Sequence, residues 1–173
     1  MSLIYTRIAK EADLNEIMVI ISNAKQFLKN AGSSQWQNGY PTGEDILQDI
    51  KQKHGFVLIV DGKIAGYCAT IVGIEPTYLD IKGEWHNESD LYATIHRMAI
   101  AREYRGQHLA SYLLSDIISI FVAQKITNFR IDTSKQNQIV QHLATTHNFK
   151  RRGIISVTED PINPERLAFE LNL

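Results

Sequence analysis

The residues from His96 to Leu114, HRMAIAREYRGQHLASYLL, restrict the fold more than any other part of the sequence. They pass from an apolar, β-favouring stretch through a polar turn with one glycine into a helical pattern. The apolar face of that helix is formed by Leu109, Leu113, Ile117 and Ile120. We expect a strand over 91–100, a helix over 109–123 and a strand over 128–133. Because a crossover of this length returns beside its starting strand, the two strands should be parallel neighbours.

Shorter patterns on both sides of this crossover predict a mixed sheet. Asp61-Gly62 between two apolar runs predicts a tight hairpin, since both residues tolerate positive φ angles. Thr42, with Asp45 three residues later, predicts a helix start with an imperfect capping box. Residues 75–90 lack periodicity and predict a loop with at most a turn of helix. Further strands are expected over 3–8, 56–60, 63–72, 149–157 and 167–173, and further helices over 13–28 and 136–146. The chain should therefore be an α/β protein with a partly antiparallel sheet.

Composition excludes several classes of function. The net charge of −1 gives no basic field, so nucleic acid is not an expected partner. Cys68 is the one cysteine, which excludes an internal disulfide and a cysteine-rich zinc site and fits a reducing, cytoplasmic location. No metal site is expected. Arg7, Lys10 and Asp13 interrupt the N-terminal apolar residues, so we expect no signal peptide, and no run is long enough to span a membrane. A single domain over 1–173 is the simplest interpretation.

The join at Gly106 could hold an anion. The first N–H groups of a helix have no partner within the helix, and the helix dipole favours negative charge there. Arg105 adds a cation, and Gly106 lets the backbone approach a ligand. The amides of residues 106–111 could then cradle a diphosphate. Spacing alone leaves open a second interpretation, in which Gly106 is only a turn residue and Arg105 only a solvated charge.

The same segment resembles the cofactor-binding core of the GNAT superfamily of N-acetyltransferases. That family has the loop pattern Arg/Gln-x-x-Gly-x-Gly/Ala, and this chain has Arg105-Gly106-Gln107-His108-Leu109-Ala110. The first and last positions match, whereas His108 replaces the middle glycine. Downstream, IDTSKQNQIVQHLATTHNFKRRG is similar to the later strand and helix of the family, with Asn137 in the asparagine position and Asn148-Phe149 in place of Gly-Phe. Asparagine suits the left-handed conformation needed at such a helix end.

The resemblance implies a mostly antiparallel central sheet with one parallel, splayed strand pair and flanking helices. It further implies that acetyl-CoA is the cosubstrate and lies between the splayed strands, paired with the first strand as if it were an added strand. Asn137 would bind it from the second strand. The residues expected to bind it are Met98, Ala99, Ile100, Arg105, Gly106, Gln107, His108, Leu109, Ala110, Ser111 and Asn137.

Acetyl transfer to an amine needs a base, and the family often carries one two residues before the Met98 position. His96 occupies that position, and an imidazole suits proton removal near neutral pH. Strict alternation along the strand would place Thr94, His96, Met98 and Ile100 on one face and Arg97, with a structural role, on the other. A second interpretation makes His96 a wall residue without a role in proton transfer. No covalent intermediate is required if amine and thioester are held together.

The residue that would protonate the leaving thiolate is left open. The family commonly has a tyrosine seven residues after the asparagine, where this chain has Ala144. Other proton donors in this region are Ser134, His142, Thr145 and His147. The spacing of His142 and His147 argues against a chelating pair.

Aromatic and acidic residues in the two irregular segments are candidates for binding a cationic amine. We expect Trp36, Glu84 and Trp85 to contact it, although loop aromatics often only anchor a loop. The expected activity is transfer of an acetyl group from acetyl-CoA to a primary amine of a small molecule or peptide. A catalytically degenerate CoA-binding or regulatory module and a plain interaction domain are the alternatives. A homodimer is a further option, since GNAT domains often dimerise.

Overall fold

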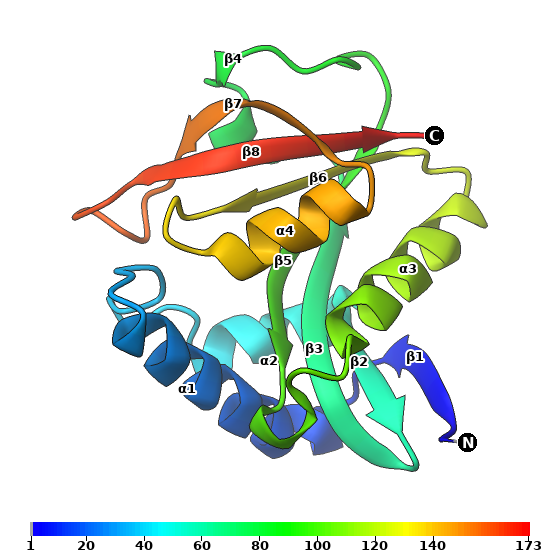
Figure 1. The fold of residues 1–173 in the computed structure, drawn as a ribbon. Coiled ribbons are helices and arrows are strands. Elements are labelled where there is room, and N and C mark those ends of the chain that lie inside the picture. Colours follow the sequence, from blue (N-terminus) through cyan, green and yellow to red (C-terminus); the bar gives the residue numbers. More distant parts are fainter. Residues whose placement is uncertain (1) are drawn as a thin grey trace.

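A computed structural model describes residues 2–173, which form one eight-stranded sheet with four α-helices (Figure 1). The strands are β1 (Ile4–Ile8), β2 (Gly55–Val60), β3 (Lys63–Val72), β4 (Lys82–Gly83), β5 (Tyr92–Ile100), β6 (Asn128–Thr133), β7 (Lys150–Ser156) and β8 (Glu165–Asn172). The helices are α1 (Leu14–Asn30), α2 (Gly43–Lys51), α3 (Leu109–Val122) and α4 (Gln138–Thr146). Three short 3-10 helices are η1 (Glu11–Asp13), η2 (Pro76–Tyr78) and η3 (Arg102–Tyr104).

The order of strands in the sheet is β1-β2-β3-β5-β6-β8-β7-β4. Only β5 and β6 pair in parallel, and the other neighbours pair antiparallel. This confirms the predicted mixed α/β fold, mostly antiparallel with one parallel pair. The short strand β4, which pairs with β7, was not predicted, because a two-residue strand has no periodicity to detect.

Helices cover both faces of the sheet (Figure 1). On one face α1 and α2 pack through a cluster that includes Ile17, Ile21 and Ile46. On the other, α3 and α4 pack through a cluster that includes Leu113 and Phe129. Among residues 2–173, none of the helices is long and apolar enough to cross a membrane.

The start of α2 has the complete capping box that the sequence only suggested. Thr42 Oγ1 accepts a hydrogen bond from the Asp45 amide at 3.2 Å, and the Asp45 carboxylate accepts one from the Thr42 amide at 2.6 Å. Two otherwise unpaired amides are thereby satisfied. The shorter aspartate side chain therefore serves as well as the glutamate of the usual motif.

The parallel pair is joined only at its beginning. Paired residues run from Tyr92–Asn128 to Thr94–Arg130, after which β5 continues to Ile100 and β6 to Thr133 without pairing to each other. The strands therefore splay over their second halves, as the resemblance implied. An opening is created in the middle of the sheet, between its two halves.

A β-bulge interrupts β5 within this splayed half. Cys68 of β3 lies opposite two residues, Arg97 and Met98, because Tyr67 pairs with Ala99 and Ala69 with His96. Arg97 has a φ of 54°, in the left-handed region that non-glycine residues rarely adopt.

The bulge corrects the predicted faces of this strand. One extra residue shifts the alternation, so Met98 and Ile100 contact the α3–α4 cluster to which Ile95 belongs. The expectation that Thr94 and His96 share a face with Met98 and Ile100 is therefore wrong. Strict alternation holds only for a regular ladder, and β5 is regular only up to His96.

Candidate active site

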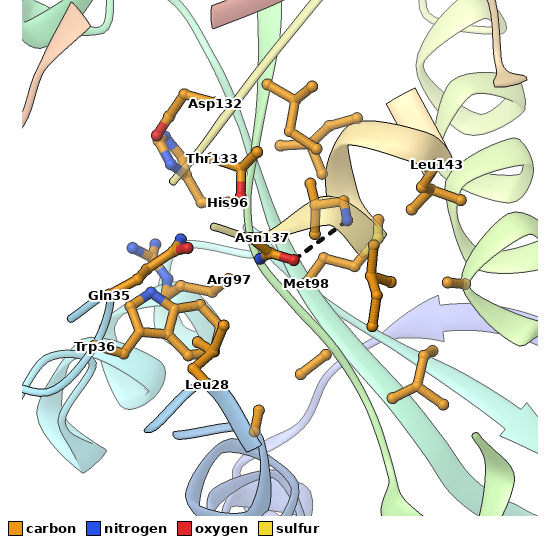
Figure 2. Close-up of a pocket in the computed structure, with 18 of the residues that line it drawn as sticks. Leu28, Gln35, Trp36, His96, Arg97, Met98, Asp132, Thr133, Asn137 and Leu143 are labelled. Carbon is orange, nitrogen blue, oxygen red and sulfur yellow. Dashed lines mark hydrogen bonds between the residues drawn. The ribbon is translucent and has the colours of Figure 1, made fainter. Parts of the chain in front are cut away.

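A cavity of about 870 Å³ occupies the opening between the splayed strands. Residues 95–100 of β5 line one side of it and residues 131–133 of β6 line the other. The start of α3 and the inner face of α4 close one end, and the loop after α1 closes the other. In Figure 2, Asn137 and Met98 lie in the middle of the cavity, with Leu143 to one side and Gln35, Trp36 and Arg97 to the other.

The loop before α3 presents a run of free amides. Gly106 has a φ of +79° with no atom within 4 Å of an added Cβ, and His108 takes the left-handed conformation with a φ of 58°. Within residues 2–173, no acceptor is found for the amides of 106–110, whereas the Ser111 amide donates to the His108 carbonyl at 3.0 Å. Free N–H groups at a helix N-terminus favour an anion beside them.

His108 stands at the position where the family pattern has a glycine, and it takes a left-handed conformation that glycine adopts readily. The side chain of His108 is exposed, so a Cβ is tolerated although the conformation is strained.

Positive charge flanks these amides. The Arg105 guanidinium lies 4.7 Å from the centre of the Phe27 ring and donates to the Asn23 carbonyl at 3.3 Å. Partial burial, and then the nearby Arg102, lower the pKa of Arg105 from its usual value. Gln107 does not line the cavity, because its side chain turns back and donates to the Glu103 carbonyl at 3.2 Å.

Asn137 is placed at the opposite wall as the N-cap of α4. Its Oδ1 accepts a hydrogen bond from the Val140 amide at 3.3 Å, drawn as a dashed line in Figure 2. The carboxamide N–H₂ is then the part left for a ligand carbonyl. Nearby in the wall, the Thr133 hydroxyl is buried without a partner among residues 2–173. Sequence reasoning did not identify Thr133, because an isolated strand threonine has no distinguishing signal.

His96 lines the cavity where the two strands diverge. Its Nε2 lies 3.3 Å from Oε2 of Glu75, a residue that the sequence analysis did not select. The facing imidazole lowers the pKa of Glu75 to about 2, although burial acts in the opposite direction. The sequence did contain a signal for the local structure of this residue, because an acidic residue followed by proline is typical of the start of a helical turn. In the structure, Glu75 is the N-cap of η2 and Pro76 is its first residue.

Arg97, which lines the cavity, belongs to a buried charge cluster. Its guanidinium donates to both carboxylate oxygens of Asp49, at 2.8 and 2.6 Å, and also contacts the Tyr40 hydroxyl. Tyr67 donates to the same carboxylate at 2.8 Å. Burial would lower the pKa of Arg97, but Tyr40 and Asp49 raise it above its usual value. The predicted structural role for Arg97 fits this arrangement.

Acidic side chains also line the cavity. Asp132 accepts a hydrogen bond from the Tyr78 hydroxyl at 2.7 Å, and burial, followed by this carboxylate, raises the pKa of Tyr78. Glu159 also lines the cavity. Trp36 is half-buried in the cavity wall, where the sequence analysis expected an amine-binding residue.

Trp85 and Glu84, which the sequence analysis expected to contact the amine, do not line this cavity. Trp85 is 7% exposed, donates from its indole nitrogen to the Tyr78 carbonyl at 3.0 Å, and stacks 3.9 Å from the guanidinium of Arg130. Glu84 is exposed on the loop after β4. Trp85 therefore anchors its loop on the sheet, the alternative interpretation for a loop aromatic.

The candidate proton donors differ in whether they line the cavity. Ala144 is fully buried, and the Ser134 hydroxyl donates to the Gln136 side chain at 2.6 Å and does not line the cavity. His142 and His147 of the α4 region do line it.

Comparisons with known proteins agree with this geometry. The sequence model of the Acetyltransferase (GNAT) family matches residues 25–149. YesJ of Bacillus subtilis, described as an uncharacterized N-acetyltransferase, is 24% identical over 143 residues, which are 81% of this chain and 74% of that protein. A GNAT-family acetyltransferase from Streptococcus agalactiae is 33% identical with a TM-score of 0.89, covering 98% of this chain and 95% of its own.

A more distant structure shares the fold. PaiA N-acetyltransferase from Thermoplasma acidophilum, solved in complex with coenzyme A, is 16% identical with a TM-score of 0.69 over 99% of both chains. The family match covers more than half of the sequence, and the Streptococcus structure matches nearly all of it. This chain therefore belongs to the acetyltransferase (GNAT) family.

Proposed function

We propose that this protein transfers an acetyl group from acetyl-CoA to a primary amine of a small molecule or peptide, by direct attack in a ternary complex. One observation carries the proposal: a single cavity connects the loop before α3, where Gly106 and residues 108–110 line it with free amides, to His96 through the gap between β5 and β6. Binding of the cofactor diphosphate at one end and proton acceptance at the other are two of the requirements of this reaction.

The residues present fit coenzyme A. The amides of 106–110, with Arg105 beside them, suit its diphosphate, and the Asn137 carboxamide suits a carbonyl of its amide-containing arm. Met98, Ala99 and Ile100 supply an extended backbone alongside. The coenzyme A complex of the Thermoplasma protein supports the same class of ligand here. When bound, acetyl-CoA supplies an activated acyl carbon and a good leaving group.

We assign the role of base to His96. The acceptor enters as an ammonium ion, and one proton moves to the imidazole so that the nitrogen regains its lone pair. The nitrogen–carbon bond forms, the carbon–sulfur bond breaks, and its electron pair leaves on sulfur. Overall, an ammonium ion and a thioester give an amide, a thiol and one proton released to solvent.

The acceptor would lie between His96 and Trp36, in a cavity whose lining also includes Asp132 and Glu159. A positively charged amine is favoured by these carboxylates and by the face of an aromatic ring. The buried Arg97 does not oppose this charge, because Asp49 already neutralises it. Trp36 therefore remains an amine-contacting residue in this proposal.

A thiol-release assay with acetyl-CoA tests the proposal against a panel of polyamines, amino acids, aminoglycosides and peptides. We expect release with at least one amine, and a fall in kcat of about 10²- to 10⁴-fold in H96A. An unchanged rate and pH profile in H96A would remove the assignment of the base. No release with any amine would remove the proposed function.

The replacement of the usual tyrosine by Ala144 favours one alternative, a module that binds acetyl-CoA without turnover. Calorimetry distinguishes the two, since a module would bind acetyl-CoA and release no thiol. A plain interaction domain would not bind at all, and its melting temperature would not change with excess ligand.

A further inference from the structure

Glu75 is held more rigidly than a surface carboxylate. Its Oε1 accepts hydrogen bonds from the Thr77 amide at 3.3 Å and the Thr77 hydroxyl at 2.9 Å. Its own amide donates to the Tyr92 hydroxyl at 2.8 Å, and Pro76 follows it directly. Both its backbone and one carboxylate oxygen are therefore fixed before His96 is considered.

The second carboxylate oxygen faces His96. Oε2 lies 3.3 Å from Nε2, and only 21% of the Glu75 side chain and 20% of the His96 side chain are exposed. With a pKa of about 2, Glu75 is ionised at all pH values at which the protein would work. An ionised carboxylate can only accept, so it favours a proton on Nε2 even without a linear hydrogen bond.

A proton on Nε2 leaves the lone pair of neutral His96 on Nδ1. Among residues 2–173, Nδ1 makes no hydrogen bond to another protein group and is not one of the fully buried unpaired atoms, and His96 lines the cavity. We propose that Glu75 is the positioning residue of His96, fixing its neutral form as the Nε2–H tautomer so that Nδ1 accepts the proton of the acceptor amine. This role rests on the proposed acetyl transfer.

Glu75 does not take that proton itself. A carboxylate with a pKa of about 2 is too weak a base to deprotonate an ammonium ion at a useful rate. In the proposed step the proton leaves the ammonium nitrogen for Nδ1, and its bonding electron pair stays on nitrogen. The negative charge of Glu75 then stabilises the imidazolium that forms.

The other charged groups that line the substrate end of the cavity do not pair with His96. Asp132 of β6 accepts from Tyr78, and Arg97 of β5 is bound to Asp49. Glu159, from the segment after β7, also lines the cavity. Among the ion pairs of residues 2–173, only Glu75 is paired with His96.

Kinetics of Glu75→Gln give the first test, with Asp80→Asn, an exposed residue of the same loop, as the matched control. We expect kcat to fall at least about tenfold in E75Q, with the KM for acetyl-CoA unchanged. Loss of the charge disfavours the imidazolium, so the acidic limb of the rate profile should move to lower pH. E75D keeps the charge and should keep that limb near its wild-type position. Wild-type kcat and profile in E75Q would overturn the assignment.

The tautomer of His96 gives a test that needs no turnover. Two-dimensional ¹⁵N spectra of the imidazoles at alkaline pH, assigned with H96Q, should show Nε2–H in the wild-type protein. E75Q should shift His96 toward a mixture, whereas D80N should not. An Nδ1–H tautomer in the wild type would refute the inference, whether or not E75Q folds. If no amine is acetylated but Nε2–H is found, the proposed function fails while the link between Glu75 and His96 stands.

Discussion

Removal of the Asp49 carboxylate should destabilise this protein more than loss of any surface ion pair. Asp49 accepts three hydrogen bonds, two from Arg97 and one from Tyr67, at 2.6 to 2.8 Å. The Asp49 and Arg97 side chains are only 6% and 10% exposed. In D49A the guanidinium stays buried without its counterion, a change that costs about 3–5 kcal/mol. For a chain of this size, the melting temperature should fall by about 6–20 °C.

The pair formed by Arg7 and Asp13 is a natural control. It has the same two-bond geometry, at 2.7 and 2.9 Å, but the Arg7 side chain is 30% exposed. Solvent screens such a pair, so R7A should cost only about 0.2–1 kcal/mol. The comparison separates the effect of burial from that of geometry.

Urea unfolding of D49A, R97A and the double variant measures the coupling directly. The double variant should be more stable than the sum of the single changes predicts, by at least about 1 kcal/mol, because neither charge remains without its partner. A loss below about 1 kcal/mol in D49A, or simple additivity, would refute the reasoning. Since Arg97 occupies the bulge next to His96, D49A should also lower kcat.

Three further predictions concern the loop before α3, the two tryptophans and acid stability. Gly106→Val should weaken acetyl-CoA binding in calorimetry without unfolding the protein, because a β-branched residue is strained at a φ of +79° while no atom would meet its Cβ. His108→Gly should instead stabilise the protein by about 1 kcal/mol and raise its melting temperature by a few degrees. Equal melting temperatures of H108G and H108A would contradict this. Trp85→Leu should destabilise the protein by about 3 kcal/mol and leave the KM for the amine unchanged, whereas Trp36→Ala should raise that KM. A raised KM in Trp85→Leu with an unchanged KM in Trp36→Ala would identify Trp85 as the substrate contact. Because the pKa of Glu75 is lowered from 4.5 to about 2, its stabilising contribution is present above pH 4.5 and is lost as pH falls toward 2. The free energy of unfolding of E75Q in urea should therefore depend less on pH in that range than that of the wild type. Parallel plots of unfolding free energy against pH for the two proteins would be inconsistent with an ionised Glu75.

The order of elements was readable from the sequence because each depends on local periodicity and turn chemistry. The strands 63–72 and 128–133 have the predicted bounds, and the other elements that were predicted differ from the structure by at most a few residues at either end. Asn148, with a φ of 63°, takes the left-handed conformation expected of it at a helix end. The parallel pairing of β5 and β6 followed from the length of the crossover between them.

The composition of the site was only partly readable. Residues 105–110 formed a recognisable pattern, and His96 and Trp36 do line the cavity. Gln107 fits the loop pattern as well as its neighbours do, and Trp85 fits amine binding as well as Trp36 does, yet neither residue lines the cavity. A side chain's direction depends on the contacts it makes across the fold, and Trp85 stacks on a residue that lies far along the chain.

Sequence alone determined the fold class, the crossover and the turn at Gly106, since these follow from neighbouring residues. Tertiary structure decided which groups meet. The bulge at Arg97 arises from pairing with β3 and reverses the faces of the following residues, which no pattern within β5 predicts. The contact between Glu75 and His96 joins two segments 21 positions apart, and only packing of the loop against the sheet brings them within 3.3 Å.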